Sequence, residues 1–171
     1  GQAMDDYLAA IDDISKEKYV DKNRLGCVGA SYGGYSVFML AGIHNNRFKT
    51  FISHDGIFDT KSMYGTTEEL WFVNFDYGGA YWDKNQAAQK TYSAQNPINH
   101  VAKWNTPIMI VQGGMDFRVP IEQGLQAFQA AQLRGIKSKL LYLPGENHWV
   151  STAQNGLVWQ REFFKWLKET L

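Results

Sequence analysis

Cysteine, net charge and long apolar runs are all scarce in this sequence. Cys27 is the single cysteine among 171 residues, so no disulfide can form within the chain. The 17 basic and 17 acidic residues balance and form no basic run, which argues against nucleic acid as a partner. No apolar run approaches the length that spans a bilayer, so we expect no membrane partner.

Metal-binding patterns are missing as well. The sequence contains no H-E-x-x-H and no cluster of cysteines and histidines. We therefore expect no metal and no cofactor. What remains is a chain long enough for one domain, in which 44% hydrophobic residues can build a core.

The stretch from Arg24 to Ile43 is the most informative part of the chain. A short apolar run ends at a glycine, and an apolar-periodic segment follows a serine, which predicts strand, sharp turn and helix. The turn reads G-A-S-Y-G over residues 29–33, the G-x-S-x-G pattern of a nucleophile elbow. In so tight a turn we expect side chains at positions 29 and 33 to collide with backbone.

Ser31 would then stand exposed above the sheet, at the N-terminus of a helix. The helix amides and dipole favour an anion forming beside the serine. The alternative is a glycine-rich turn in which the serine only caps the helix.

The rest of the chain alternates predicted strands and helices. Strands are predicted at residues 25–28, 48–54, 107–112 and 139–143, and helices at 3–16, from about 32 to 43, from 120 to a stop at 135, and at 155–171. Strands separated by helices imply crossover connections and a mostly parallel sheet with helices on both faces. The predicted fold class is therefore α/β.

Residues 58–92 differ in kind from the remainder. They are rich in aromatic side chains but show no steady periodicity. We expect an excursion from the core fold that forms short helices over a pocket.

Ser31, Asp116 and His148 each follow the end of a different predicted strand. In open α/β sheets the ligand crevice lies outside the carboxyl ends of the strands, so folding should bring all three to one edge. Their order along the chain, Ser, Asp, His, is the order of an α/β-hydrolase triad.

Each of the triad positions has competitors. Asp55 also follows a strand end and could serve as the acid, but Asp116 lies on the strand nearer in sequence to His148. The other histidines are His44 at the end of the elbow helix, His54 beside the elbow and His100 in a connector. His44 suits the dipole at its helix end, and the His54 imidazole could approach the site as a supporting group that does not itself react.

Three ordered motifs carry a family resemblance: GASYGG at residues 29–34, GGMDFRVP at 113–120 and GENHW at 145–149. Together they resemble the catalytic domain of the prolyl oligopeptidase family of serine peptidases, most of all its dipeptidyl-peptidase and acylaminoacyl-peptidase branch. The resemblance runs over nearly the whole chain and implies the α/β-hydrolase fold.

The resemblance also implies roles for particular residues. Ser31 would be the nucleophile, Asp116 the orienting acid, His148 the general base and the Tyr32 amide one oxyanion donor. Arg118 would contact a substrate backbone carbonyl, unless it only forms a salt bridge within its loop. Val119 would line the pocket for the residue before the cut bond, with aromatics from Phe58 to Trp82, Phe58 and Trp71 among them, supplying the rest.

Compared with that family, residues 1–171 correspond to the C-terminal part of the catalytic domain, a truncated α/β-hydrolase fold. The early strands, a loop with the second oxyanion donor and an N-terminal β-propeller are absent, and we expect that propeller of the parent chain as a partner. This chain alone should be poorly active, because losing one oxyanion donor lowers turnover by about a hundred- to a thousandfold. One flank of the sheet should be uncovered, which favours association between copies.

The predicted activity is hydrolysis of peptide bonds in short peptides through an acyl-enzyme, with release of dipeptides or acylated residues from N-termini. Peptides are therefore the expected substrates. A carboxylesterase of the same fold and a non-catalytic hydrolase-fold module are the alternatives. The compartment stays open: periplasmic or secreted for a bacterial dipeptidyl peptidase, cytoplasmic otherwise.

Overall fold

A single parallel sheet organises the computed structural model, which describes residues 2–171. Its strands lie in sequence order: β1 (Gly26–Ala30), β2 (Thr50–His54), β3 (Ile108–Gly113) and β4 (Ser138–Leu143). All three strand pairs are parallel, with Ala30 opposite His54 and His54 opposite Val111. The predicted α/β class is confirmed, and strand bounds differ from the predicted ones by a few residues at most.

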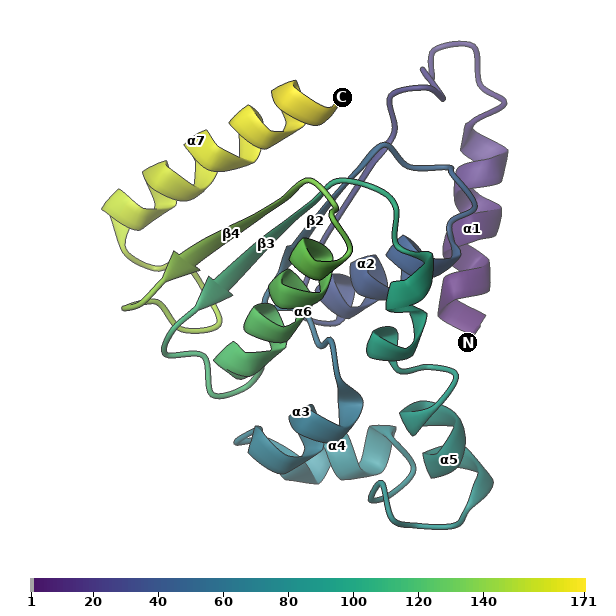
Figure 1. Cartoon of the computed structure of the whole chain (residues 1–171), viewed down its shortest axis with the longest axis vertical. Helices are drawn as coiled ribbons and strands as arrows, with labels where there is room; N and C mark the ends of the chain where they lie inside the picture. Colours follow the sequence, from purple (N-terminus) through teal and green to yellow (C-terminus); the bar gives the residue numbers. More distant parts are fainter. Residues whose placement is uncertain (1) are drawn as a thin grey trace.

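Helices cover both faces of this sheet (Figure 1). The helices α1 (Gln2–Ile14), α2 (Tyr32–Ile43) and α6 (Ile121–Leu133) pack on one face, and α7 (Ala153–Thr170) packs on the other. Alternation along the buried strands supplies both cores, because successive side chains point to opposite faces. Ile108 and Ile110 of β3 belong to the first core, whereas Met109 and Val111 belong to the second.

Three short helices form the predicted excursion between β2 and β3: α3 (Thr60–Thr66), α4 (Leu70–Asp76) and α5 (Gln86–Tyr92). A short 3₁₀ helix, η1 (Pro97–Lys103), returns the chain to the sheet. Polar side chains fix where α3 and α5 begin: Asp59 accepts from the Lys61 amide and Asn85 from the Ala88 amide. Figure 1 shows these helices as a separate group beyond one end of the sheet.

The edge of the sheet at β1 carries no further strand within residues 2–171. The side chains of β1 alternate between exposed and half-buried, and 49% of Val28 is exposed. This agrees with the predicted uncovered flank, while association of copies there stays a prediction. None of the described helices is both long and apolar enough to cross a membrane.

The glycines of the elbow have unequal roles. A Cβ on Gly29 would overlap the Gly33 carbonyl, which confirms the steric expectation at position 29. The expectation at Gly33 is wrong, because a Cβ there meets nothing within 4 Å. Gly34 is the crowded position instead: its Cβ would lie 2.6 Å from Gly56 Cα and 2.8 Å from His54 O, where α2 crosses the end of β2.

We predict that Gly34→Ala destabilises the chain by about 1–3 kcal/mol, because the atoms it would strike are backbone and cannot rotate away. Gly33→Ala is the matched control, since its new methyl group enters open space within a helix. Urea unfolding of both variants measures the difference. Equal losses of unfolding free energy would contradict the packing argument.

Candidate active site

Ser31 lies between the last residue of β1 and the first residue of α2. Its backbone has φ 57° and ψ −118°, a left-handed conformation that costs a non-glycine residue energy and is concentrated at functional sites. The Ser31 N–H donates to His54 O at 2.9 Å, which ties the turn to β2. Its side chain makes no capping hydrogen bond, which argues against the alternative that this serine only caps α2.

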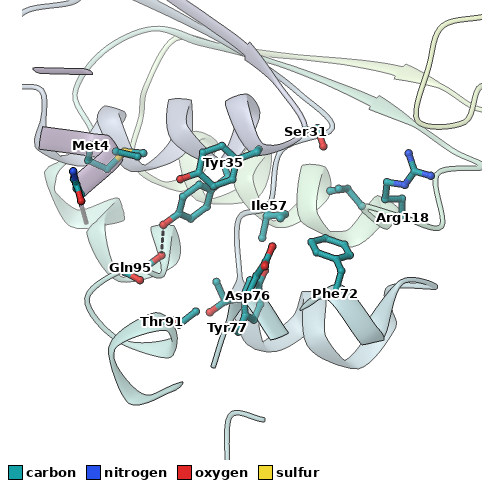
Figure 2. Close-up of a pocket in the computed structure, with 15 residues that line it drawn as sticks. Met4, Ser31, Tyr35, Ile57, Phe72, Asp76, Tyr77, Thr91, Gln95 and Arg118 are labelled. Atoms are coloured by element: carbon teal, nitrogen blue, oxygen red, sulfur yellow. Dashed lines mark hydrogen bonds between the residues drawn. The ribbon is translucent and has the colours of Figure 1, made fainter. Parts of the chain in front are cut away.

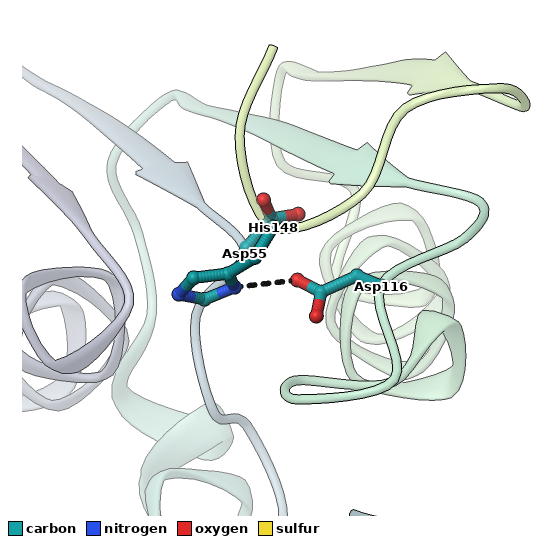
Figure 3. Close-up of side chains that lie close together, drawn as sticks. All are labelled: Asp55, Asp116 and His148. Carbon is teal, nitrogen blue, oxygen red and sulfur yellow. Dashed lines mark hydrogen bonds and ion pairs between the residues drawn. The ribbon is translucent and has the colours of Figure 1, made fainter. Parts of the chain in front are cut away.

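Asp116 and His148 meet at the carboxyl ends of β3 and β4 (Figure 3). His148 Nδ1 lies 2.7 Å from Asp116 Oδ2, and only 9% of His148 and 2% of Asp116 are exposed. A carboxylate accepts, so Nδ1 carries the proton and Nε2 is left as an acceptor. The other oxygen of Asp116 accepts from the amides of Arg118 and Val119, both at 2.9 Å.

The competing groups have other contacts. Asp55 Oδ1 accepts from the Gly113 amide at 3.0 Å, and Asp55 Oδ2 lies 3.1 Å from His54 Nε2. His44 is buried, and its Nδ1 accepts from the Phe48 amide. Burial lowers the pKa of His44, so this ring is neutral rather than the charged dipole partner that its position at the helix end favoured.

Asp55 nevertheless lies beside the pair. Single donor atoms of Asp55, Asp116 and His148 all fall within 4.8 Å of one another, a spacing that could hold a metal ion. The absence of a metal stays a prediction of the sequence. The position of Asp55 after a strand end had already indicated that its side chain could lie close to the site.

Glu146 braces the loop that carries His148, although no role for it was predicted from the GENHW motif that contains it. The carboxylate accepts from the Ser151 amide at 2.7 Å, the Thr152 amide at 3.3 Å and Asn155 Nδ2 at 2.6 Å. These donors lie around the start of α7, where a negative charge is favoured. Hydrogen bonds from Thr152, Asn155 and Ser151, in that order, lower the Glu146 pKa to about 2.

A cavity of about 500 Å³ opens beside Ser31 (Figure 2). Four residues named from the sequence line it, namely Ser31, Tyr32, Arg118 and Val119. Arg118 also forms the ion pair that the alternative expected, although with Glu69 at the start of α4 rather than within its own loop. Its Nε lies 3.0 Å from Glu69 Oε1 without hydrogen-bonding geometry.

Phe58 and Trp71 are corrections, because neither is among the described residues that line the cavity. Phe58 is 1% exposed and packs edge-on against the stacked rings of Phe38 and Trp104, with centroid distances of 5.6 and 5.7 Å. Trp71 is 78% exposed on the outer side of α4.

Two other aromatics from the predicted stretch between Phe58 and Trp82, Phe72 and Tyr77, do line the cavity, so the wider prediction for that stretch is confirmed. Tyr35 and Ile57, which lie outside the stretch, complete this part of the lining and were not predicted. Tyr77 directly follows α4 and packs in one cluster with Val73, four residues earlier.

Comparison with known proteins gives consistent results. A family model described as the prolyl oligopeptidase family matches residues 1–171. Dipeptidyl-peptidase 5 of Porphyromonas gingivalis is 53% identical over 172 residues, which cover 100% of this chain and 25% of that protein. Dipeptidyl-peptidase 5 of Schizosaccharomyces pombe is 37% identical over 150 residues, covering 87% of this chain and 21% of that protein.

Solved structures share the fold at low sequence identity. The acylaminoacyl peptidase of Pyrococcus horikoshii has a TM-score of 0.87 and 19% identity, covering 98% of this chain and 28% of that one. Dipeptidyl peptidase 4 of Porphyromonas gingivalis has a TM-score of 0.82 and 22% identity, and the match covers 98% of this chain and 22% of that one. The predicted α/β-hydrolase fold is confirmed, and the chain spans about a quarter of the length of the relatives it matches.

We predict that Glu146→Gln weakens the His148 loop and changes how stability depends on acid. Because the folded pKa of about 2 lies below the ordinary 4.5, the carboxylate stabilises the fold above pH 4.5 and loses this effect as the pH falls toward 2. The variant should therefore unfold at lower urea concentration at pH 7 and lose less of its remaining stability between pH 4.5 and 2.

Glu17→Gln, a change at an exposed acid, is the control. Urea titrations at several pH values make the measurement. An unchanged difference between wild type and Glu146→Gln across this pH range would show that the charge is not what braces the loop.

Proposed function

The chain belongs to the prolyl oligopeptidase family, and from that premise we propose that it forms the C-terminal, catalytic part of a serine peptidase that releases dipeptides from peptide N-termini. The observation that carries the proposal is the buried 2.7 Å hydrogen bond between His148 Nδ1 and Asp116 Oδ2, on the same edge of the sheet as Ser31. The name printed for the relatives, dipeptidyl-peptidase 5, supports the choice of dipeptides.

The proposed chemistry is acyl transfer in two steps. His148 Nε2 takes the proton of Ser31 as Oγ attacks the peptide carbonyl, and it later gives the proton to the leaving amine. Asp116 keeps the proton of the ring on Nδ1 and stabilises the imidazolium. Water then attacks the acyl-enzyme by the same acid-base route and releases the dipeptide.

The oxyanion of the tetrahedral intermediate would be held by the Tyr32 amide. Tyr32 is the first residue of α2, so its N–H has no carbonyl partner within the helix. The helix dipole favours negative charge at the same point. A second donor would come from a part of the parent protein outside this chain, where the parent is the longer protein that the 25% coverage of the relatives suggests.

The substrate side chain next to the cut bond would enter the cavity beside Ser31. Val119, which is buried, and the rings of Phe72 and Tyr77 give it an apolar wall. Arg118 would reach a backbone carbonyl of the substrate, at the expense of its ion pair with Glu69. This part of the wall favours an apolar substrate side chain, whereas Asp76 and Arg118 add charged groups elsewhere around the cavity.

We predict that Ser31→Ala and His148→Ala each lower turnover of a dipeptidyl amide by the parent about 10⁴-fold or more, because the nucleophile and its base act as a unit. Ser36→Ala is the matched control: Ser36 lies on α2 and its hydroxyl donates only to Tyr32 O. Steady-state kinetics and labelling by a fluorophosphonate measure both effects. A normal rate in either variant would remove that residue from the triad.

A panel of dipeptidyl amides and p-nitrophenyl esters tests the reaction class. Peptidase activity predicts cleavage of the amides by the parent, whereas cleavage of esters alone would favour a carboxylesterase. An absence of fluorophosphonate labelling in the parent would favour a non-catalytic module.

We predict that the isolated chain turns over a dipeptidyl amide about a hundred- to a thousandfold more slowly than the parent, because one oxyanion donor is missing from it. Turnover per labelled serine compares the two on an equal basis. Equal rates would mean that residues 1–171 already hold the complete oxyanion site.

A further inference from the structure

Asp55 is a buried carboxylate that the proposed chemistry does not use. It directly follows β2, and only 1% of it is exposed. Its N–H donates to Val111 O, and its Oδ1 accepts from the Gly113 N–H at 3.0 Å. Asp55 therefore holds the start of the loop that carries Asp116.

The second oxygen of Asp55 has no hydrogen bond within residues 2–171 and is buried. His54 Nε2 lies 3.1 Å from this oxygen, out of hydrogen-bonding geometry. A buried carboxylate oxygen without a donor is costly, so it is rarely retained without a reason. Burial, helped by the nearby Asp116, raises the pKa of Asp55 above its ordinary value, although His54 and the Gly113 amide act in the opposite direction.

The backbone conformation of Asp55 and the close packing of the next residue fix the position of its carboxylate. Its φ of 44° is a left-handed conformation, which Asp and Asn tolerate better than most residues. The next residue, Gly56, packs so closely that a Cβ on it would lie 2.6 Å from Gly34 C in the elbow helix. The carboxylate is therefore held where Figure 3 shows it, beside the His148 ring and within 4.8 Å of both members of the pair.

Resting on the proposed function, we propose that Asp55 is a second acid of this site: a positioning residue that holds the Asp116 loop through Gly113 and shares with Asp116 the orientation and charge stabilisation of His148. In wild type, Asp116 makes the hydrogen bond to Nδ1, and Asp55 adds negative charge near the imidazolium. When the Asp116 carboxylate is removed and leaves space, Asp55 accepts from the Nδ1–H in its place.

Two replacements of Asp116 in the parent protein separate this role from a structural one. Asp116→Asn fills the space with an amide and holds the wrong tautomer, so kcat should fall about 10⁴-fold. Asp116→Ala leaves room for Asp55, so we expect its kcat to stay about tenfold or more above that of Asp116→Asn. When Asp55→Asn is added to both variants, the kcat of Asp116→Ala should fall to that of Asp116→Asn.

Asp55→Asn alone should lower kcat more than it raises KM, since the substrate does not touch this residue. Asp59→Asn is the matched control, because Asp59 caps α3 and Asn caps a helix equally well. If Asp55 only shapes its loop, adding Asp55→Asn lowers kcat of the wild type and of both Asp116 variants by the same factor. The ratio of kcat between Asp116→Ala and Asp116→Asn is then the same with and without Asp55→Asn. That result overturns the inference.

A second measurement needs no change at Asp55 and covers the case in which Asp55→Asn does not fold. In the proton NMR spectrum of Asp116→Ala, the Nδ1–H of His148 should remain visible at low field, bonded to Asp55. Its loss overturns the inference. Failure of the proposed function looks different, because Asp116→Asn and His148→Ala would then leave turnover intact.

Discussion

The hydrogen bond between His148 and Asp116 depends on two loops that backbone contacts clamp together. The Met115 amide donates to Glu146 O at 2.8 Å and the Gly114 amide to Leu143 O at 2.9 Å. Gly113 allows this approach, because a Cβ there would lie 2.8 Å from Glu146 O. A larger residue at this point would push the loops apart and separate the acid from the imidazole.

The parallel sheet explains why such distant residues can meet at all. Carboxyl ends of parallel strands share one edge, so the loops after β1, β3 and β4 converge while the helices between them cover the faces. Asp55 and Glu146 then fix the details: one holds the Asp116 loop through Gly113, and the other ties the His148 loop to the start of α7. Buried charges thus position the groups that would react.

The sequence predicts the sheet and its covering helices because apolar alternation and turn residues report directly on burial. It also predicts that Asp116 and His148 lie at one edge, since both follow strand ends. Prediction from the sequence fails where three-dimensional packing decides which side chains line the cavity and which glycines are crowded. Phe58 belongs to the core rather than to the cavity, and the crowded glycine after Ser31 is Gly34 rather than Gly33. Neither distinction leaves a periodic signal in the chain.

The central claim is that Ser31, His148 and Asp116 act as one hydrogen-bonded chain. A crystal structure of the parent protein inactivated by a fluorophosphonate tests it most directly. The account predicts phosphorus bonded to Ser31 Oγ, a phosphoryl oxygen on the Tyr32 amide, and His148 Nε2 within hydrogen-bonding distance of the adduct, with its Nδ1 still on Asp116. An adduct on another residue, or an imidazole turned away from a modified Ser31, would contradict it.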